Sequence, residues 1–323
     1  MRIAITLGDP NGIGPEIAIK AATHFASDAQ IRPFLVGDGF VIRDTANRLG
    51  LETPDFIDAP ALDPAGYAPG QLDPRAGKAT VAYVDIALRL AREGAVDAII
   101  GCPHSETAVN RAGIVFNGYP QLVADLTRTP RDKAFMMLVA QGLRIAHVTL
   151  HESVATALGR LTPDLVVAAA QAAVATAKRI GIAAPKLGVV GINPHAGEDG
   201  LFGNEDELIT KPAVARLRLA GIEVDGPIGA DLLLSQRKHD IYLAMFHDQG
   251  HIPIKLISPL RASALTIGVP VLFASVAHGC AYDIAGKGVA DATGIIETLE
   301  LLAGANLDGA ESPGPPPLSS RAE

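Results

Sequence analysis

Short apolar runs alternate along the chain with longer segments in which apolar residues recur at helical spacing. The short runs predict strands at residues 2–7, 32–36, 97–101, 135–139, 143–150, 186–190, 223–225, 241–245 and 266–275. The longer segments predict helices at residues 13–25, 38–49, 73–93, 162–180, 210–219 and 291–302, with another after residues 118–120. This alternation predicts an α/β protein in which helices bury short strands.

Local signals support several of these boundaries. Residues 73–74 and 162–163 place Asp or Thr directly before Pro, a pair that starts helices. Residues 141–142 (Gln-Gly) join two predicted strands, which indicates a hairpin. The Gly-Ile-Gly at residues 12–14 lacks the full GxGxxG spacing, so a tight turn explains it about as well as a dinucleotide site does.

Composition narrows the class of protein. The chain has 323 residues, enough for two domains with their own cores. Its net charge of −8 and its lack of a Lys/Arg run argue against nucleic acid and anionic membranes as partners. Two isolated cysteines, Cys102 and Cys280, indicate a reduced compartment, and neither a signal peptide nor a membrane-spanning run is apparent. We therefore expect a soluble cytoplasmic protein, with a disordered Pro-rich tail at residues 305–323.

Three histidines stand at or just beyond the ends of predicted strands: His147, His195 and His247. In open α/β sheets, ligands bind beyond the carboxyl ends of the strands. A single histidine in such a place is more often structural than a metal ligand. Three in matching positions favour a divalent metal, because neutral imidazoles suit Zn, Co or Fe(II) and three protein ligands are typical of a catalytic site.

Charged and histidine residues near these three histidines are further candidates for the predicted metal site. Asp248 could orient an imidazole or act as a base, and a solvated or capping Asp is an equal alternative. Lys255 either extends to the surface or points its ammonium group at an anionic substrate. His151 and His251 are second-shell candidates or are simply exposed, and exposure is the favoured interpretation for His251.

A glycine-rich stretch at residues 276–291, VAHGCAYDIAGKGVAD, precedes the last predicted helix. It is either a glycine-rich connection ahead of that helix or a loop whose backbone holds an adenine ribose, with an acidic side chain on a hydroxyl. Spacing alone does not decide between the two.

Together, these motifs resemble the PdxA family, the 4-hydroxythreonine-4-phosphate dehydrogenases and their relatives. The resemblance runs from about residue 3 to 302, and the glycine stretch is also similar to the nucleotide loop of isopropylmalate and isocitrate dehydrogenases. The motifs that carry it are GDPNGIGPEI, HVTLHES, GINPHAGE, GPIGAD, AMFHDQG and SVAHG…DIAGKGVAD.

The resemblance implies two α/β/α domains around a central cleft, as in isocitrate and isopropylmalate dehydrogenases. The first would comprise residues 1–128 plus 268–304, and the second, residues 129–267, would carry the metal ligands and the dimer contacts. It further implies a homodimer with active sites at the subunit interface, a divalent metal and NAD(P). Zinc is the expected metal, with Co, Fe, Mn or Mg as alternatives.

The resemblance also assigns residues. His147, His195 and His247 fall on the metal-ligand positions, and Lys255 on a substrate-contacting lysine. With Lys255, Asp248 is the candidate for catalysis. The cofactor would be NAD rather than NADP, because an acidic residue near the ribose, Asp283 or Asp291, disfavours a 2′-phosphate. The residues expected to bind the cofactor are His278, Gly279, Asp283, Gly286 and Asp291.

Departures from the family pattern concern the substrate. The pyridoxal branch has a His-Thr pair where this chain has Tyr119 and Pro120, and an Asn and an Arg where it has Ala264 and Phe273. Each lost charged hydrogen bond to a phosphate costs about 1.5–3 kcal/mol, which argues against a phosphorylated substrate. The chain is more similar to the branch acting on the terephthalate cis-dihydrodiol.

That branch implies oxidation of a carboxylated cis-dihydrodiol followed by β-decarboxylation to a catechol, protocatechuate. The substrate ring would pack on Tyr119, Pro120 and Phe273, and Lys255 would pair with a carboxylate. The alternatives are 4-hydroxythreonine 4-phosphate or a phospho-sugar-acid as substrate, a two-domain binding protein without chemistry, and a metal lyase or aldolase that needs no nicotinamide.

Overall fold

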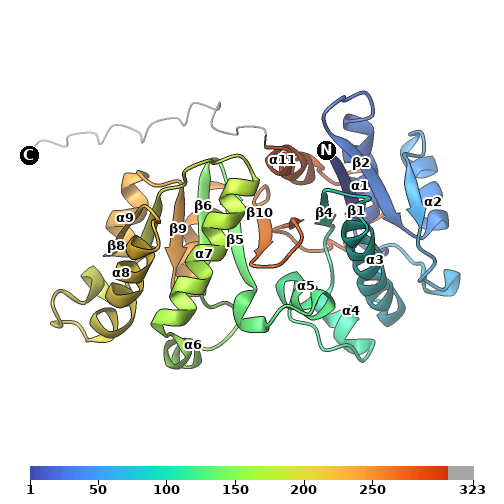
Figure 1. The fold of residues 1–323 in the computed structure, drawn as a ribbon. Helices are drawn as coiled ribbons and strands as arrows, with labels where there is room; N and C mark the ends of the chain where they lie inside the picture. The colour runs from blue at the N-terminus through green and yellow to red at the C-terminus, as the bar shows by residue number, and fades with distance from the viewer. Residues whose placement is uncertain (305–323) are drawn as a thin grey trace, which may run out of the picture.

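The computed structural model describes residues 1–304 and forms one long mixed sheet covered by helices on both faces (Figure 1). The strands are β1 (Arg2–Thr6), β2 (Arg32–Gly37), β3 (Phe56–Asp58), β4 (Ala98–Gly101), β5 (Phe135–Ala140), β6 (Leu143–His147), β7 (Leu187–Val190), β8 (Val224–Ile228), β9 (Ile241–Ala244), β10 (Ser263–Ile267) and β11 (Phe273–Val276). The expected α/β class is confirmed.

The helices connect these strands along the chain. The longer ones are α1 (Gly14–His24), α2 (Gly39–Leu49), α3 (Pro74–Arg92), α4 (Glu106–Arg111), α5 (Tyr119–Thr127), α6 (Val154–Arg160), α7 (Pro163–Arg179), α8 (Lys211–Leu219), α9 (Ala230–Gln236), α10 (His247–Ile257) and α11 (Thr293–Leu302). Single turns are η1 (Pro64–Gly66), η2 (Arg131–Lys133), η3 (Pro194–Gly197) and the π-helical η4 (Asp206–Thr210).

The strand order is β3-β2-β1-β4-β11-β10-β5-β6-β9-β7-β8. Strands β3, β2, β1, β4 and β11 form one parallel group, and β6, β9, β7 and β8 form a second. Between them, β10 and β5 are antiparallel to their neighbours and reverse the strand direction. Since the carboxyl ends of parallel strands share an edge, each group has its own edge at which loops gather.

Helices pack on both faces of each group (Figure 1). In the first group, α1 contacts α2 and α11, while α3 contacts α4 and α5 together with β1, β2 and β4. In the second, α7 contacts β5, β6 and β9, and α10 contacts the same three strands. Most strands are accordingly apolar and almost fully buried, as the apolar runs predicted, whereas β3 and β8 at the two ends of the sheet are only partly buried.

Most predicted elements are confirmed, with one difference that matters for the site. Residues 247–250 were expected to form a loop, but they are the first turn of α10, which contains Pro253. The Gln249 side chain accepts hydrogen bonds from the backbone N–H groups of Met245 and Phe246 and so caps the helix start. The predicted strand at 266–275 is a hairpin of β10 and β11, and α4, α6 and α9 are additional helices.

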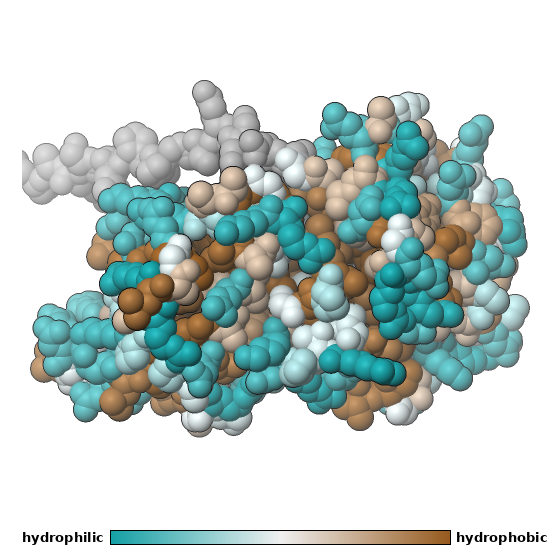
Figure 2. Space-filling view, viewed as in Figure 1, coloured by the Kyte–Doolittle hydropathy of each residue, from teal (hydrophilic) through white to brown (hydrophobic). Residues whose placement is uncertain are grey.

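The proposed domain border at residue 267/268 falls between β10 and β11, and it stays a prediction. The expected disordered tail at 305–323 lies outside the described residues. Hydrophilic residues cover much of the face shown in Figure 2, with small apolar areas among them. Within residues 1–304, no helix combines the length and apolar character needed to cross a membrane.

Candidate functional site

Three adjacent strands of the second parallel group deliver the histidine-bearing segments to one edge of the sheet. Strand β9 pairs in parallel with β6 on one side and with β7 on the other. His147 ends β6, His247 follows β9, and His195 lies in η3 after β7. The fold thus places side by side three segments that are about 50 residues apart in sequence.

Four imidazoles form a continuous series at this edge. His147 Nε2 lies 3.2 Å from His251 Nδ1. The His251 ring stacks on the His247 ring, with centroids 3.6 Å apart and an interplanar angle of 12°. The His151 ring centroid is 5.5 Å from that of His247. His251 is therefore partly buried between two other histidines, and the expectation that it is simply exposed is wrong.

The two histidines of the β6 segment, His147 and His151, differ in accessibility. His147 is fully buried, and its Nε2 atom is engaged by His251. His151 is exposed and shares with His247 and Asp248 the lining of a cavity of about 270 Å³. His151 is therefore the more accessible imidazole beside His247, and the assignment of His147 as a metal ligand stays a prediction.

His195 occupies a strained backbone position at the end of β7. Its φ of 55° lies in the left-handed region, and its ring is largely exposed. Its Nδ1 lies 2.9 Å from Glu198 Oε2, and this hydrogen bond raises the pKa of His195. The buried Asp206 holds the preceding backbone by accepting hydrogen bonds from the N–H groups of Ile192 and Asn193.

The side chains present fit a divalent metal in their chemistry, although they are not gathered around one point. In both His195 and His247, Nδ1 contacts a carboxylate oxygen, at 2.9 Å from Glu198 and 2.8 Å from Asp248. This arrangement fixes the ring and leaves Nε2 for a metal. Across residues 1–304, no three His, Cys, Asp or Glu side chains are arranged to hold a metal ion. Asp248 thus has the geometry of an orienting group.

Lys255 lies at the end of α10, between the histidine series and the glycine-rich loop. Its Nζ donates hydrogen bonds to the carbonyls of Pro259 and Ala277. Burial lowers the pKa of Lys255. Burial, and to a smaller extent the charge of Lys255, also lowers the pKa of His251 and of His278. The Lys255 amino group therefore lies between the histidine series and the glycine-rich loop, which are the two parts of the predicted site.

The loop at residues 277–292 is held by groups on the first parallel group of strands. Glu16 accepts hydrogen bonds from the N–H groups of Gly288 and Ala290, at 3.1 and 2.7 Å. The Tyr282 hydroxyl donates to Asp9 at 2.6 Å, and burial raises the pKa of Asp9. These hydrogen bonds attach the loop to α1 and to the segment that follows β1.

The predicted cofactor residues lie in this loop. Gly279 has open space where a Cβ would stand, and Asp283 is exposed. Gly286 has a φ of +74° and lies against Pro69. Asp291 accepts hydrogen bonds from the backbone and side chain of Thr293 and so begins α11. His278 contacts its neighbour's carbonyl at 3.2 Å.

The predicted substrate residues are divided between core and cavity. Tyr119 and Phe273 are almost fully buried, with ring centroids 5.2 Å apart, and the Tyr119 hydroxyl donates to the Cys102 carbonyl. Both rings are buried in the structure, and the packing of a substrate ring on them stays a prediction. Pro120 lines a second cavity of about 280 Å³, which shares residues 149–152 with the histidine cavity.

Acid sensitivity follows from the buried imidazoles. Burial lowers the pKa of His147 to about 3, against 6.5 for an ordinary histidine. Below pH 6.5 the unfolded chain takes up a proton that the folded chain does not, so the free energy of unfolding should fall as the pH drops from 6.5 towards 3. The loss from this residue is on the order of 4 kcal/mol, measurable as urea midpoints against pH.

The variants His147→Leu and His24→Ala test this assignment. Leu cannot take up a proton, so the pH dependence between 6.5 and 4 should flatten. His24 is exposed, and its removal should leave the slope unchanged. A slope unaffected by His147→Leu would show that this histidine is not the acid-sensitive group.

Comparisons with known proteins give matches over most of the chain. The family model described as pyridoxal phosphate biosynthetic protein PdxA matches residues 18–302. The 1,2-dihydroxy-3,5-cyclohexadiene-1,4-dicarboxylate dehydrogenase of Comamonas sp is 51% identical over 306 residues, covering 93% of this chain and 96% of that protein.

Two solved structures are similar over nearly the same length. A terephthalate 1,2-cis-dihydrodiol dehydrogenase from Burkholderia xenovorans LB400 has 47% identity and a TM-score of 0.73, covering 94% of this chain and 98% of that one. A 4-hydroxythreonine-4-phosphate dehydrogenase from Burkholderia phymatum has 37% identity and a TM-score of 0.81, with the same coverage.

Proposed function

The chain belongs to the PdxA family and is an oxidoreductase of its dehydrogenase type, and from that premise we propose that it oxidises a carboxylated cis-dihydrodiol with NAD. Loss of CO₂ from the carbon next to the new ketone then yields a catechol. The 51% identity to a dehydrogenase named for a ring diol dicarboxylate supports this choice over the phosphorylated substrates of other relatives.

The choice of substrate rests on the side chains at Tyr119, Ala264 and Phe273. Tyr119 and Phe273 pack against each other in the core, and Ala264 lies nearby on β10, which pairs with β11. These are the positions at which the resemblance places His, Arg and Asn donors for a phosphorylated substrate. Apolar side chains there cannot donate to a phosphate dianion, whose desolvation would remain uncompensated.

We assign the metal to His147, His195 and His247, and NAD to the loop containing His278, Gly279, Asp283, Gly286 and Asp291. A bound divalent ion would stabilise negative charge on the reacting oxygen, and NAD would accept the hydride. Asp248 and Glu198 hold the rings of His247 and His195 through Nδ1. These carboxylates therefore set ring orientation and leave Nε2 free.

Lys255 is the candidate for proton transfer and for pairing with the substrate carboxylate. Its lowered pKa increases the fraction of neutral Nζ, which can accept the proton of the alcohol. Oxidation removes this proton and a hydride from the carbinol. The carbon–carboxylate bond then breaks, its electrons form the enolate, and Nζ returns the proton to the enolate oxygen to give the catechol.

A homodimer that shares its active sites is part of the proposal. The His195 ring is largely exposed, and within residues 1–304 no three His, Cys, Asp or Glu side chains are arranged to hold a metal ion. Leu201, Phe202 and Leu208, in the segment that follows it, are exposed large apolar residues. A partner subunit covering this surface would bury them and bring further groups to His195.

The test offers the purified, metal-loaded protein NAD with either the 1,4-dicarboxylate cis-dihydrodiol or 4-hydroxythreonine 4-phosphate. We expect NADH absorbance and equimolar CO₂ with the diol only. Turnover of the phosphorylated substrate alone would establish the alternative. Binding of NAD without turnover of any diol would exclude the proposed reaction, and failure to bind NAD would favour a metal lyase or aldolase.

A further inference from the structure

The second cavity, of about 280 Å³, lies beside the histidine cavity and is not used by the mechanism above. The two share Thr149, Leu150, His151 and Glu152 in their linings. A molecule whose alcohol lies at His151 and His247 would therefore extend from one cavity into the other. The second cavity is thus placed to hold the part of the substrate remote from the reacting carbon.

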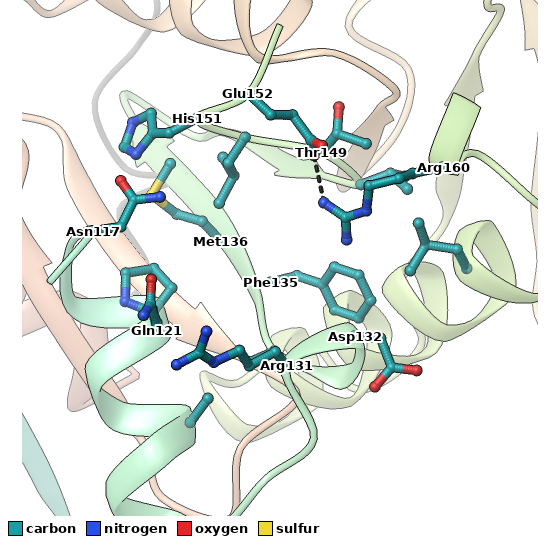
Figure 3. Close-up of a pocket in the computed structure, with 16 residues that line it drawn as sticks. Asn117, Gln121, Arg131, Asp132, Phe135, Met136, Thr149, His151, Glu152 and Arg160 are labelled. Carbon is teal, nitrogen blue, oxygen red and sulfur yellow. Dashed lines mark hydrogen bonds and ion pairs between the residues drawn. The ribbon is translucent and has the colours of Figure 1, made fainter. Parts of the chain in front are cut away.

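The walls of this cavity combine an apolar floor with two guanidinium groups. Figure 3 shows Arg131 and Gln121 on one side of Phe135, and Arg160 with Glu152 on the other. Phe135 lies buried beneath the cavity, and the partly exposed Leu150 and Leu165 form apolar parts of its lining. A flat apolar ring suits this floor, and planar guanidinium groups suit a planar carboxylate that they can bind in bidentate fashion.

Each arginine is oriented by a carboxylate but retains unused donors. Arg160 Nη1 donates to Glu152 Oε1 at 2.6 Å, and its Nε and Nη2 make no hydrogen bond within residues 1–304. Arg131 Nε and Nη2 donate to the two oxygens of Asp125, both at 2.9 Å, and its Nη1 is unused in the same range. The free donors are available to a ligand.

The net charge of the two arginine–carboxylate pairs favours a carboxylate over a phosphate as ligand. Because each guanidinium already faces one carboxylate, the two pairs carry little net positive charge. A singly charged carboxylate can add to their unused donors at a modest electrostatic cost, whereas a phosphate dianion would face less compensation. The cavity is therefore better matched to a carboxylate than to a phosphate.

We propose that Arg131 and Arg160 bind the second carboxylate of a ring dicarboxylate, the one that the reaction retains, and so select dicarboxylates over monocarboxylates. This inference rests on the proposed function for the identity of the ring, but the binding preference is measurable without turnover. The arginines are specificity residues, since they lie away from the reacting carbon.

The experiment measures binding and kinetics separately. Terephthalate and benzoate, which differ by one carboxylate and cannot react, are titrated calorimetrically into the metal-loaded protein. We expect terephthalate to bind about ten- to a hundredfold more tightly than benzoate, as charged hydrogen bonds to one carboxylate would give. In Arg160→Gln and Arg131→Gln this ratio should approach one, with benzoate affinity unchanged.

Two further variants act as controls. Arg128→Gln removes a positive charge from the same stretch of chain but does not line the cavity, so the ratio should persist. Arg160→Lys keeps the positive charge but loses the planar guanidinium group. The preference for terephthalate over benzoate should therefore be intermediate between those of the wild type and Arg160→Gln. With the diols as substrates, Arg160→Gln should raise KM for the dicarboxylate about tenfold with little change in kcat, and leave the monocarboxylate diol unaffected.

The outcomes separate the two proposals. Equal affinity of the wild-type protein for both probes, failure to bind either, or a ratio preserved in both arginine variants would overturn the role of the cavity. A terephthalate preference that the variants abolish, in a protein that turns over neither diol, would support the cavity and overturn the proposed reaction instead.

Discussion

Replacing His247 by alanine should reduce turnover of the diol by at least about a thousandfold, because the metal's stabilisation of charge contributes several kcal/mol to the barrier. His247 is central to the imidazole series: it stacks on His251, lies beside His151 and is held by Asp248. The variant should also lose metal, measurable by elemental analysis after gel filtration.

The matched control is His24→Ala, which removes an exposed histidine from α1. Its turnover and metal content should equal those of the wild-type protein. A His247→Ala protein that retains both would remove this residue from the ligand set. Retention of metal with loss of turnover would instead assign His247 to substrate or to charge stabilisation.

A methyl group at Gly250 should destabilise the protein by on the order of 3 kcal/mol, as overpacking of a buried site does. A Cβ at Gly250 would stand 2.2 Å from His147 Nε2 and 2.8 Å from Ile145 Cγ2. Both neighbours are fully buried on β6, so α10 itself must move away from the sheet. Urea unfolding measures the loss, and turnover should fall with it because α10 begins at His247.

Gly159→Ala is the control for this substitution. Gly159 also lies in a helix, α6, but nothing stands within 4 Å of a Cβ built there. Alanine should stabilise that helix by about 0.5–1 kcal/mol, since it restricts the unfolded chain. Equal stability of Gly250→Ala and wild type would mean that α10 and β6 do not pack as closely as the structure has them.

The fold could be predicted from sequence where local signals agree with burial. Central strands of the two parallel groups, such as β4, β7 and β9, are uninterrupted apolar runs, and α3 and α7 begin at Asp-Pro and Thr-Pro pairs. The start of α10 could not be predicted in this way. His247, Asp248 and Gly250 resemble a loop, and the helix depends on a cap from Gln249 to the end of β9.

The candidate site was predicted less completely than the fold. The alternation of apolar residues predicts a strand but does not determine the residue at which the strand ends. His147 and His151 are four residues apart, and only the end of β6 at His147 places the first in the core and the second in a cavity. Glu16 was missed for a related reason. Its contacts are to Gly288 and Ala290, more than 270 residues away, and no local pattern marks them.

The arginine cavity has no sequence signature either. Arg131 follows a proline in a polar turn, and Arg160 ends a seven-residue helix, so each resembles an ordinary surface charge. Only the packing of η2 and α6 around β5 brings the two guanidinium groups to one cavity.

The position of β11 and α11 has a consequence for synthesis of the chain on the ribosome. Strand β11 extends the sheet beside β4, and α11 packs on β11, β4 and α1, so β4 acquires its second neighbouring strand only from residues 273–302. Because the nascent chain emerges amino terminus first, β4 is left with an open edge until almost all of the protein has been made. Fragments ending before residue 273 should therefore require chaperone protection, while the second parallel group can assemble earlier.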